Sequence, residues 1–218
     1  MRERLRSVLF TLCAVGTATW IAPAFAGIIP PPGPMFVVQM DASQEFVPPG
    51  STSPGTASGM AELIQEGQTN RLSFAIVFDS TFDFTADGGG GQGGAETVTG
   101  LHFHDGARST NSGIVFGMIG PNSDLDMDRS ITPMGDGTVV SGEWDSGEGA
   151  TDIDQFVAAL LAAGPNDDVA LYVNLHTDAF PSGAIRGQVV PEPAQAASGA
   201  AALGVLGVLA SRGRRRSP

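Results

Sequence analysis

Apolar and polar residues alternate along much of this chain, most clearly in residues 71–79. Leu72, Phe74, Ile76 and Phe78 recur there at every second position, while smaller or polar residues occupy the other positions. A period of two places successive side chains on opposite faces of a strand, so this segment predicts a strand with one face in the core. Shorter runs of the same kind, separated by Gly, Pro, Asp and Asn, predict further strands at residues 35–41, 58–66, 97–104, 113–119, 137–144, 169–176 and 184–190.

Residues 152–163 break this pattern, because their apolar side chains recur at helical spacing. Thr151 or Asp152 can cap the start of a helix there, and Gly164 followed by Pro165 ends it. The body of the chain is therefore expected to be all-β. It should form an antiparallel β-sandwich or barrel-like domain of about eight strands with one short helix.

Residues 1–26 predict a secretory signal peptide. A start that carries three arginines leads into an apolar stretch at residues 8–21. Ala24 and Ala26 supply the small-x-small pattern that signal peptidase recognises, so cleavage is expected after Ala26. The single cysteine, Cys13, lies within this segment, and the exported part would therefore hold no disulfide.

The chain ends with a Pro-Glu-Pro motif, an apolar segment at residues 196–210 and an arginine cluster. The apolar segment is shorter than the roughly 20 residues of a spanning helix. The arginines after it favour a cytoplasmic position for the tail. In this order the three features resemble the PEP-CTERM sorting signal of Gram-negative bacteria. The matching residues are Pro191, Glu192, Pro193, 200–210, Arg212, Arg214, Arg215 and Arg216.

This resemblance implies a route and a destination. The apolar helix would insert transiently in the inner membrane, and an exosortase, which is a membrane cysteine protease, would cut near the motif. The body would then reside at the cell surface, in the outer membrane or in the extracellular matrix. An ordinary membrane anchor is the alternative, and it also places the body outside the cytoplasmic membrane.

Charge narrows the classes of partner. Residues 27–190 contain four Arg, no Lys and 21 Asp plus Glu, which gives a net charge of −17. Nucleic acids and anionic lipid surfaces would repel such a domain, so no nucleic-acid partner is expected. The acidity would attract cations, or it would serve solubility alone.

The three histidines of the chain are candidate metal ligands. His102 and His104 stand two apart on a predicted strand and so share a face, and His176 ends another predicted strand on its non-core face. Imidazole suits both copper and zinc, so the three residues predict a Cu or Zn site if the two strands are neighbours. The alternative is structural, with the rings bonded to turns.

A second candidate cation site lies at residues 122–128. Asp124, Asp126 and Asp128 are spaced by two, as in oxygen-rich Ca²⁺ loops. Arg129 stands where an EF-hand would need glycine, so the alternative is a solvated acidic loop. No nucleophile elbow G-x-S-x-G occurs in the chain, and we expect no enzymatic activity.

The histidine segments also resemble the CHRD (chordin) domain. Residues 98–107, which include GLHFHDGA, and residues 113–116 are similar to its central strand and turn. Residues 171–177 (LYVNLHT) and 181–189 (PSGAIRGQV) are similar to its closing signature, and residues 35–49 fit its opening strand and turn. The resemblance implies a β-rich extracellular module.

These features predict a plan for the whole chain: a signal peptide at 1–26, a Pro/Gly-rich linker at 27–34, a CHRD-like domain at 35–190 and a sorting signal at 191–218. The expected function is a non-enzymatic binding or structural module at the cell surface or in the matrix, with an unidentified surface or matrix partner. The alternative is an exported copper or zinc protein that could be redox-active. Within the domain, Arg186 is expected to pair with a carboxylate, and His176 or Asn174 to bond the turn at 177–182.

Overall fold

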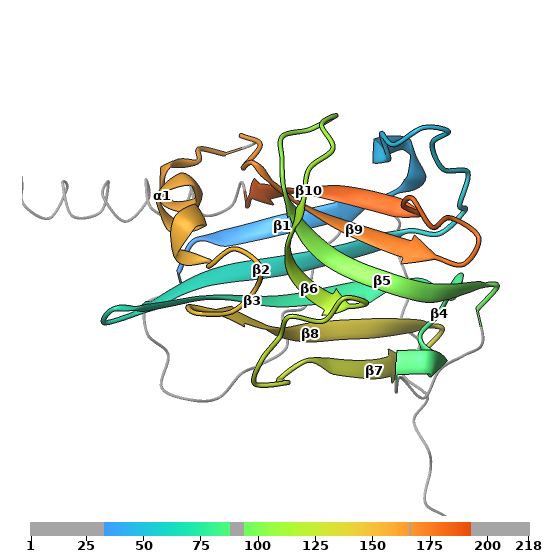
Figure 1. The fold of residues 1–218 in the computed structure, drawn as a ribbon, viewed down its shortest axis with the longest axis horizontal. Helices are drawn as coiled ribbons and strands as arrows, with labels where there is room; N and C mark the ends of the chain where they lie inside the picture. Colours follow the sequence, from blue (N-terminus) through green and yellow to red (C-terminus); the bar gives the residue numbers. More distant parts are fainter. Residues whose placement is uncertain (1–32, 88–93, 166, 193–218) are drawn as a thin grey trace, which may run out of the picture. The chain divides into compact units, whose positions relative to one another are not determined.

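Ten strands, two short 3-10 helices and one α-helix lie in the part of the chain that the computed structural model describes, which is residues 33–87, 94–165 and 167–192 (Figure 1). The strands are β1 (Met35–Met40), β2 (Ala57–Glu66), β3 (Thr69–Phe78), β4 (Phe82–Asp83), β5 (Glu96–Asp105), β6 (Ile114–Ile119), β7 (Ser130–Met134), β8 (Gly137–Asp145), β9 (Leu171–Thr177) and β10 (Ile185–Pro191). The helices are η1 (Ala42–Gln44), η2 (Thr85–Asp87) and α1 (Asp154–Ala162).

The predicted signal peptide, most of the predicted linker and all but the first two residues of the predicted sorting signal lie outside the described residues. In the part that is described, no helix has the length and apolar character needed to cross a membrane.

All eight predicted strands are present, and the all-β prediction is confirmed. Sequence patterns missed β4 and β7. β4 has two residues, and β7 is an edge strand that is largely exposed, so neither carries a periodic apolar face. β4 also pairs in parallel with β5, which departs from the otherwise antiparallel pairing. Helix α1 begins at Asp154 rather than at residue 152, and the Asp152 carboxylate accepts a hydrogen bond from the Asp154 N–H at 2.9 Å.

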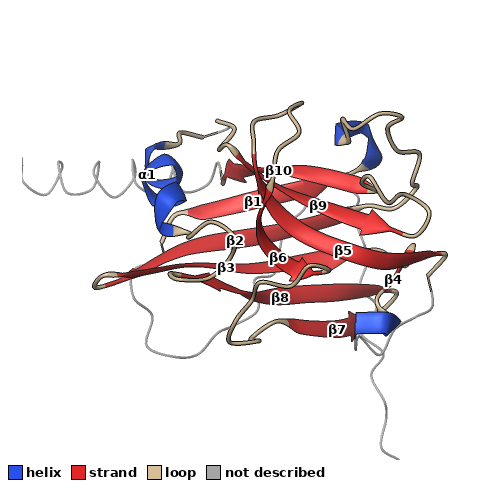
Figure 2. Cartoon of the chain, viewed as in Figure 1, coloured by secondary structure: helices blue, strands red, loops and turns tan. Residues whose placement is uncertain are grey.

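The strands form one curled sheet in the order β4-β5-β9-β10-β1-β2-β3-β8-β7, and β6 pairs with β5 (Figure 2). The long β2–β3 hairpin pairs from Ala57 with Phe78 to Glu66 with Thr69. Because β1 bonds β10, the first and last strands of the domain are neighbours. The curl brings β3 and β8 to face β5 and β6, as in a half-barrel.

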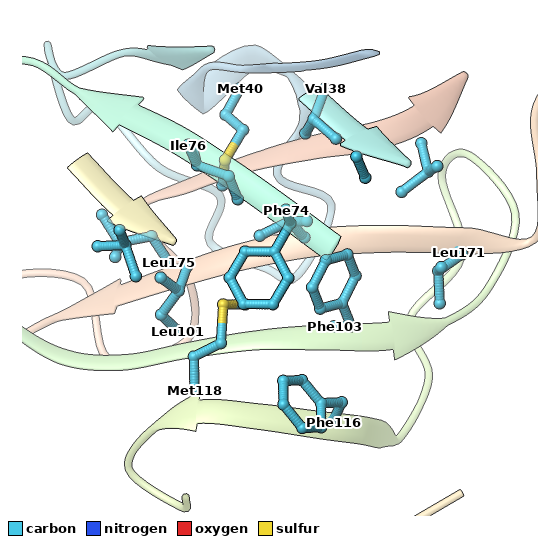
Figure 3. Close-up of a cluster of buried hydrophobic side chains, with 14 of the residues drawn as sticks. Val38, Met40, Phe74, Ile76, Leu101, Phe103, Phe116, Met118, Leu171 and Leu175 are labelled. Atoms are coloured by element: carbon cyan, nitrogen blue, oxygen red, sulfur yellow. The ribbon is translucent and has the colours of Figure 1, made fainter. Parts of the chain in front are cut away.

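The core lies inside this curl, where aromatic side chains from opposite strands meet (Figure 3). Phe74 of β3 meets Phe103 of β5 edge-on, with ring centroids 5.5 Å apart. Trp144 of β8 stacks on Phe116 of β6 at 5.4 Å and also contacts Phe156 of α1. Each buried aromatic ring removes a large apolar area from water, so these contacts hold the two halves of the sheet together without a disulfide.

Candidate metal centre

The three histidines lie together on the outer face of neighbouring strands β5 and β9. His102 and His104 come from β5, and His176 comes from β9, where it pairs with Gly100. Alternation sends Leu101 and the other apolar neighbours into the core, so the histidines face away from it. One ring nitrogen of each histidine lies within 4.8 Å of one from each of the others. The pairing of β5 with β9, which the sequence could not supply, makes this cluster.

Each histidine uses one ring nitrogen to donate a hydrogen bond to a backbone carbonyl. The three bonds run from His102 Nε2 to Gly120 O, from His104 Nδ1 to Ser112 O and from His176 Nδ1 to Pro181 O, each at 3.0 Å. A carbonyl oxygen only accepts, so these nitrogens carry the protons and the tautomers are fixed. The bond of His176 to residue 181 also fulfils the expectation that this residue holds the turn at 177–182.

The other nitrogen of each ring has no partner among the described residues. These atoms are His102 Nδ1, His104 Nε2 and His176 Nε2, and all three are buried. A neutral imidazole protonated on one side presents a lone pair on the other, which is the form that binds a metal. Metal-bound histidines usually donate their second N–H to a carbonyl or carboxylate in this way.

The spacing of the rings suits one ion. Nitrogens that bind a tetrahedral ion at about 2.0–2.1 Å are about 3.4 Å apart, a little closer than the 4.8 Å limit that holds here. The ring centroids are 5.1 Å apart for His102 and His176, 5.6 Å for His102 and His104, and 6.3 Å for His104 and His176.

Burial keeps two of these rings neutral. It lowers the pKa of His102 from 6.5 to about 4, and the hydrogen bond to the Gly120 carbonyl only partly opposes this effect. Burial also lowers the pKa of His104, against the opposing effect of its bond to Ser112. Only 3% of His102 and 6% of His104 is exposed, although the sequence pattern placed both on a non-core face. At neutral pH these rings can therefore bind a cation without first losing a proton.

The loop at residues 105–113 lies against His104, and side chains of β9 and β10 hold it in place. Tyr172 stacks on His104 with ring centroids 4.8 Å apart and an angle of 8° between the ring planes. The Arg186 guanidinium lies 3.4 Å over the other face of Tyr172 and donates to the carbonyls of Thr110 and Ala107. The expectation that Arg186 pairs with a carboxylate is wrong. Within the described residues it forms no salt bridge and donates instead to the loop backbone.

Gly100 is a site residue that the sequence analysis missed. A Cβ at this position would lie 2.7 Å from His102 Cε1, so the absent side chain makes room for the His102 ring. Because residues two apart on a strand share a face, a glycine two positions before a histidine was the available signal.

The three predicted calcium ligands also lie together, with oxygens of Asp124, Asp126 and Asp128 within 4.8 Å of one another. The buried Asp124 carboxylate accepts the N–H groups of Met127 and Arg129 at 2.7 and 3.2 Å, so it closes its own loop. Burial, and then the charges of Asp124, Asp126 and other carboxylates, raises the pKa of Asp128. The cluster is therefore a strongly acidic loop that these backbone bonds hold in shape.

Comparison with known families matches residues 36–189, more than half of the chain, to the CHRD domain. No curated protein and no solved structure gives a significant match.

Proposed function

Because this chain belongs to the CHRD domain family, we propose that it is an exported binding module whose ligand is a copper or zinc ion held by His102, His104 and His176. CHRD domains are binding-type domains that occur in extracellular proteins, which supports a non-enzymatic role outside the cell. One observation carries the proposal. Each histidine uses one nitrogen to bond a backbone carbonyl and keeps the other buried with no partner among the described residues, and the rings are close enough that one nitrogen of each lies within 4.8 Å of the others.

The energetics favour an occupied site. A buried polar atom without a partner costs about 1–3 kcal/mol, so three such nitrogens would be a substantial burden on a marginally stable domain. One cation that accepts three lone pairs removes this cost. Among the described residues, the donor set consists of three imidazole nitrogens without a carboxylate, which suits Cu or Zn and not the oxygen-seeking Ca²⁺ or Mg²⁺.

A structural role for the histidines is the second candidate function, and their three carbonyl bonds favour it. In that case the rings fasten the loop ends at residues 112, 120 and 181, and the module binds a surface or matrix partner elsewhere. The two candidates differ in one respect: only the first requires an ion at the free nitrogens.

Sequence features at both ends support the cellular part of the proposal. The signal peptide would export the chain, and the Pro191-Glu192-Pro193 motif with its apolar segment and arginines would direct it to an exosortase. The domain would then remain at the surface or in the matrix of a Gram-negative cell. Its negative net charge suits a module that is exposed to solvent outside the cell and has no nucleic-acid partner.

Metal analysis tests the proposal. The untagged protein is recovered from the periplasm, since a polyhistidine tag would bind the same ions, and its metal content is measured by mass spectrometry. We expect about one Cu or Zn per chain, and loss of that ion in a His102→Ala/His104→Ala variant. A matched Asp126→Asn/Asp128→Asn variant should keep it. No metal in the parent, even after incubation with Cu²⁺ or Zn²⁺ and desalting, would leave the structural role.

A further inference from the structure

Two more buried polar atoms near the histidine cluster have no partner among the described residues. They are Glu45 Oε2 and Asn174 Oδ1. Glu45 is 8% exposed and Asn174 is 3% exposed, so water outside the domain does not solvate these groups freely. Neither atom takes part in the hydrogen bonds that hold the histidines. Orphaned buried oxygens beside a candidate metal site indicate a missing hydrogen-bond donor.

Glu45 reaches the site from the segment that follows η1. Its Oε1 accepts the N–H groups of Phe46 and Val47 at 2.9 and 3.0 Å, which fixes the carboxylate and leaves Oε2 free. The position of Oε2 depends on Gly183. A Cβ there would lie 2.0 Å from Glu45 Oε2 and 3.0 Å from Asn174 Nδ2, so the carboxylate occupies the space of the absent side chain.

The strand register connects these groups to the metal ligands. Asn174 of β9 pairs with His102 of β5 and stands two residues before His176, so it shares their outer face. Glu45 Oε2 and Asn174 Nδ2 both lie beside the position that a Gly183 side chain would take, so the carboxylate is a neighbour of Asn174.

Three histidine ligands leave a tetrahedral ion with one open position. We propose that this position holds an exchangeable water molecule whose hydrogen atoms are bonded by Glu45 Oε2 and Asn174 Oδ1, and that small anions can displace this water. The inference rests on the proposed metal centre and adds to it a ligand site of defined chemistry. The water supplies the missing donor for both oxygens. An anion supplies no donor and brings a negative charge close to the carboxylate, so Glu45 disfavours anions.

Azide binding to the copper-loaded protein tests this assignment. The full chain is loaded with one equivalent of Cu²⁺, and stoichiometry is checked by mass spectrometry. Azide is then titrated while the azide-to-copper charge-transfer absorption and the electron paramagnetic resonance spectrum are followed. Glu45→Gln keeps an amide oxygen for the Phe46 and Val47 N–H groups but removes the charge. At an effective dielectric constant of about 20, loss of a charge a few ångströms away should tighten azide binding at least about tenfold. Glu66→Gln, at an exposed position in the β2–β3 hairpin, is the matched control and should behave as the parent.

Each outcome has one meaning. If azide does not change the spectra of the copper-loaded parent, the ion has no open position for an anion, although the metal centre itself would stand. Equal azide affinity in the parent and in Glu45→Gln, with both loaded, would remove the role of Glu45. A parent that binds no copper or zinc would remove the metal centre and this inference together. Azide binding that tightens in Glu45→Gln and not in Glu66→Gln would support the inference.

Discussion

The substitution Gly100→Ala tests the geometry of the histidine cluster most directly. The added Cβ would lie 2.7 Å from His102 Cε1, 3.1 Å from His102 Nε2 and 3.2 Å from the Gly120 carbonyl oxygen. Real Cβ atoms do not approach other atoms within 3.0 Å, so the His102 ring must move. It has little room, because it is buried and bonded to that same carbonyl.

Two opposing terms set the expected loss of stability. Overpacking a filled site costs about 1–3 kcal/mol. Replacing glycine by alanine restricts the unfolded chain and returns about 0.4–1 kcal/mol. We therefore expect the metal-free Gly100→Ala protein to lose about 1–2 kcal/mol of unfolding free energy. Because the His102 ring is displaced from its carbonyl partner, copper or zinc affinity should fall about 10–100-fold, as it does when an outer-shell bond to a ligand is lost.

Urea unfolding of the protein, made metal-free with a chelator, measures the loss of stability. Competition with a chromophoric chelator measures the loss of copper or zinc affinity. Gly113→Ala is the control, since a Cβ there meets nothing within 4 Å although the residue lies in the loop at residues 105–113. It should stay within about 0.5 kcal/mol of the parent and bind metal equally well. A Gly100→Ala protein as stable and as tightly metal-binding as Gly113→Ala would refute this account of the site.

Three further predictions follow from the contacts of individual side chains. In the metal-free protein, His102 should make the unfolding free energy fall by about 2–3 kcal/mol from pH 7 to pH 4.5. Its folded pKa of about 4 lies below the ordinary histidine value of 6.5, so the unfolded chain binds the proton first. Urea unfolding of His102→Phe should lack this component, and an identical pH dependence would contradict it. Arg186→Met should lower the unfolding free energy by about 2–4 kcal/mol, because two loop carbonyls lose their donor. Hydrogen exchange of the backbone amides should become faster first in residues 105–113, and unchanged exchange there would count against the prediction. Asp126→Asn should raise the melting temperature by about 1–3 °C at low salt, because it removes repulsion among neighbouring carboxylates. Asp126 is among the charges that, together with burial, raise the pKa of Asp145. Salt screens such repulsion, so a shift that persists in 0.5 M NaCl would exclude this cause.

The alternation of residues determined most of the fold. Leu72, Phe74 and Ile76 could only be buried together on one face of a strand, and the same reasoning located all eight longer strands. Helix α1 was visible because its apolar residues follow a different period. The two strands that were missed are short or exposed, and such segments lack a face whose burial would fix a pattern. The motifs of the closing strands were sufficient to identify the family.

The candidate site divides in the same way. The sequence placed His102 and His104 on one face, because that depends only on a period of two along one strand. It could not join them to His176, since the pairing of β5 with β9 is a contact between distant segments. Nor could it show that Arg186 bonds loop carbonyls or that the space above Gly183 admits Glu45, because both depend on which backbone lies across the sheet. Local periodicity follows from the order of residues alone, whereas the approach of His176 to the β5 histidines, and of Glu45 to Asn174, is decided only when the strands pack.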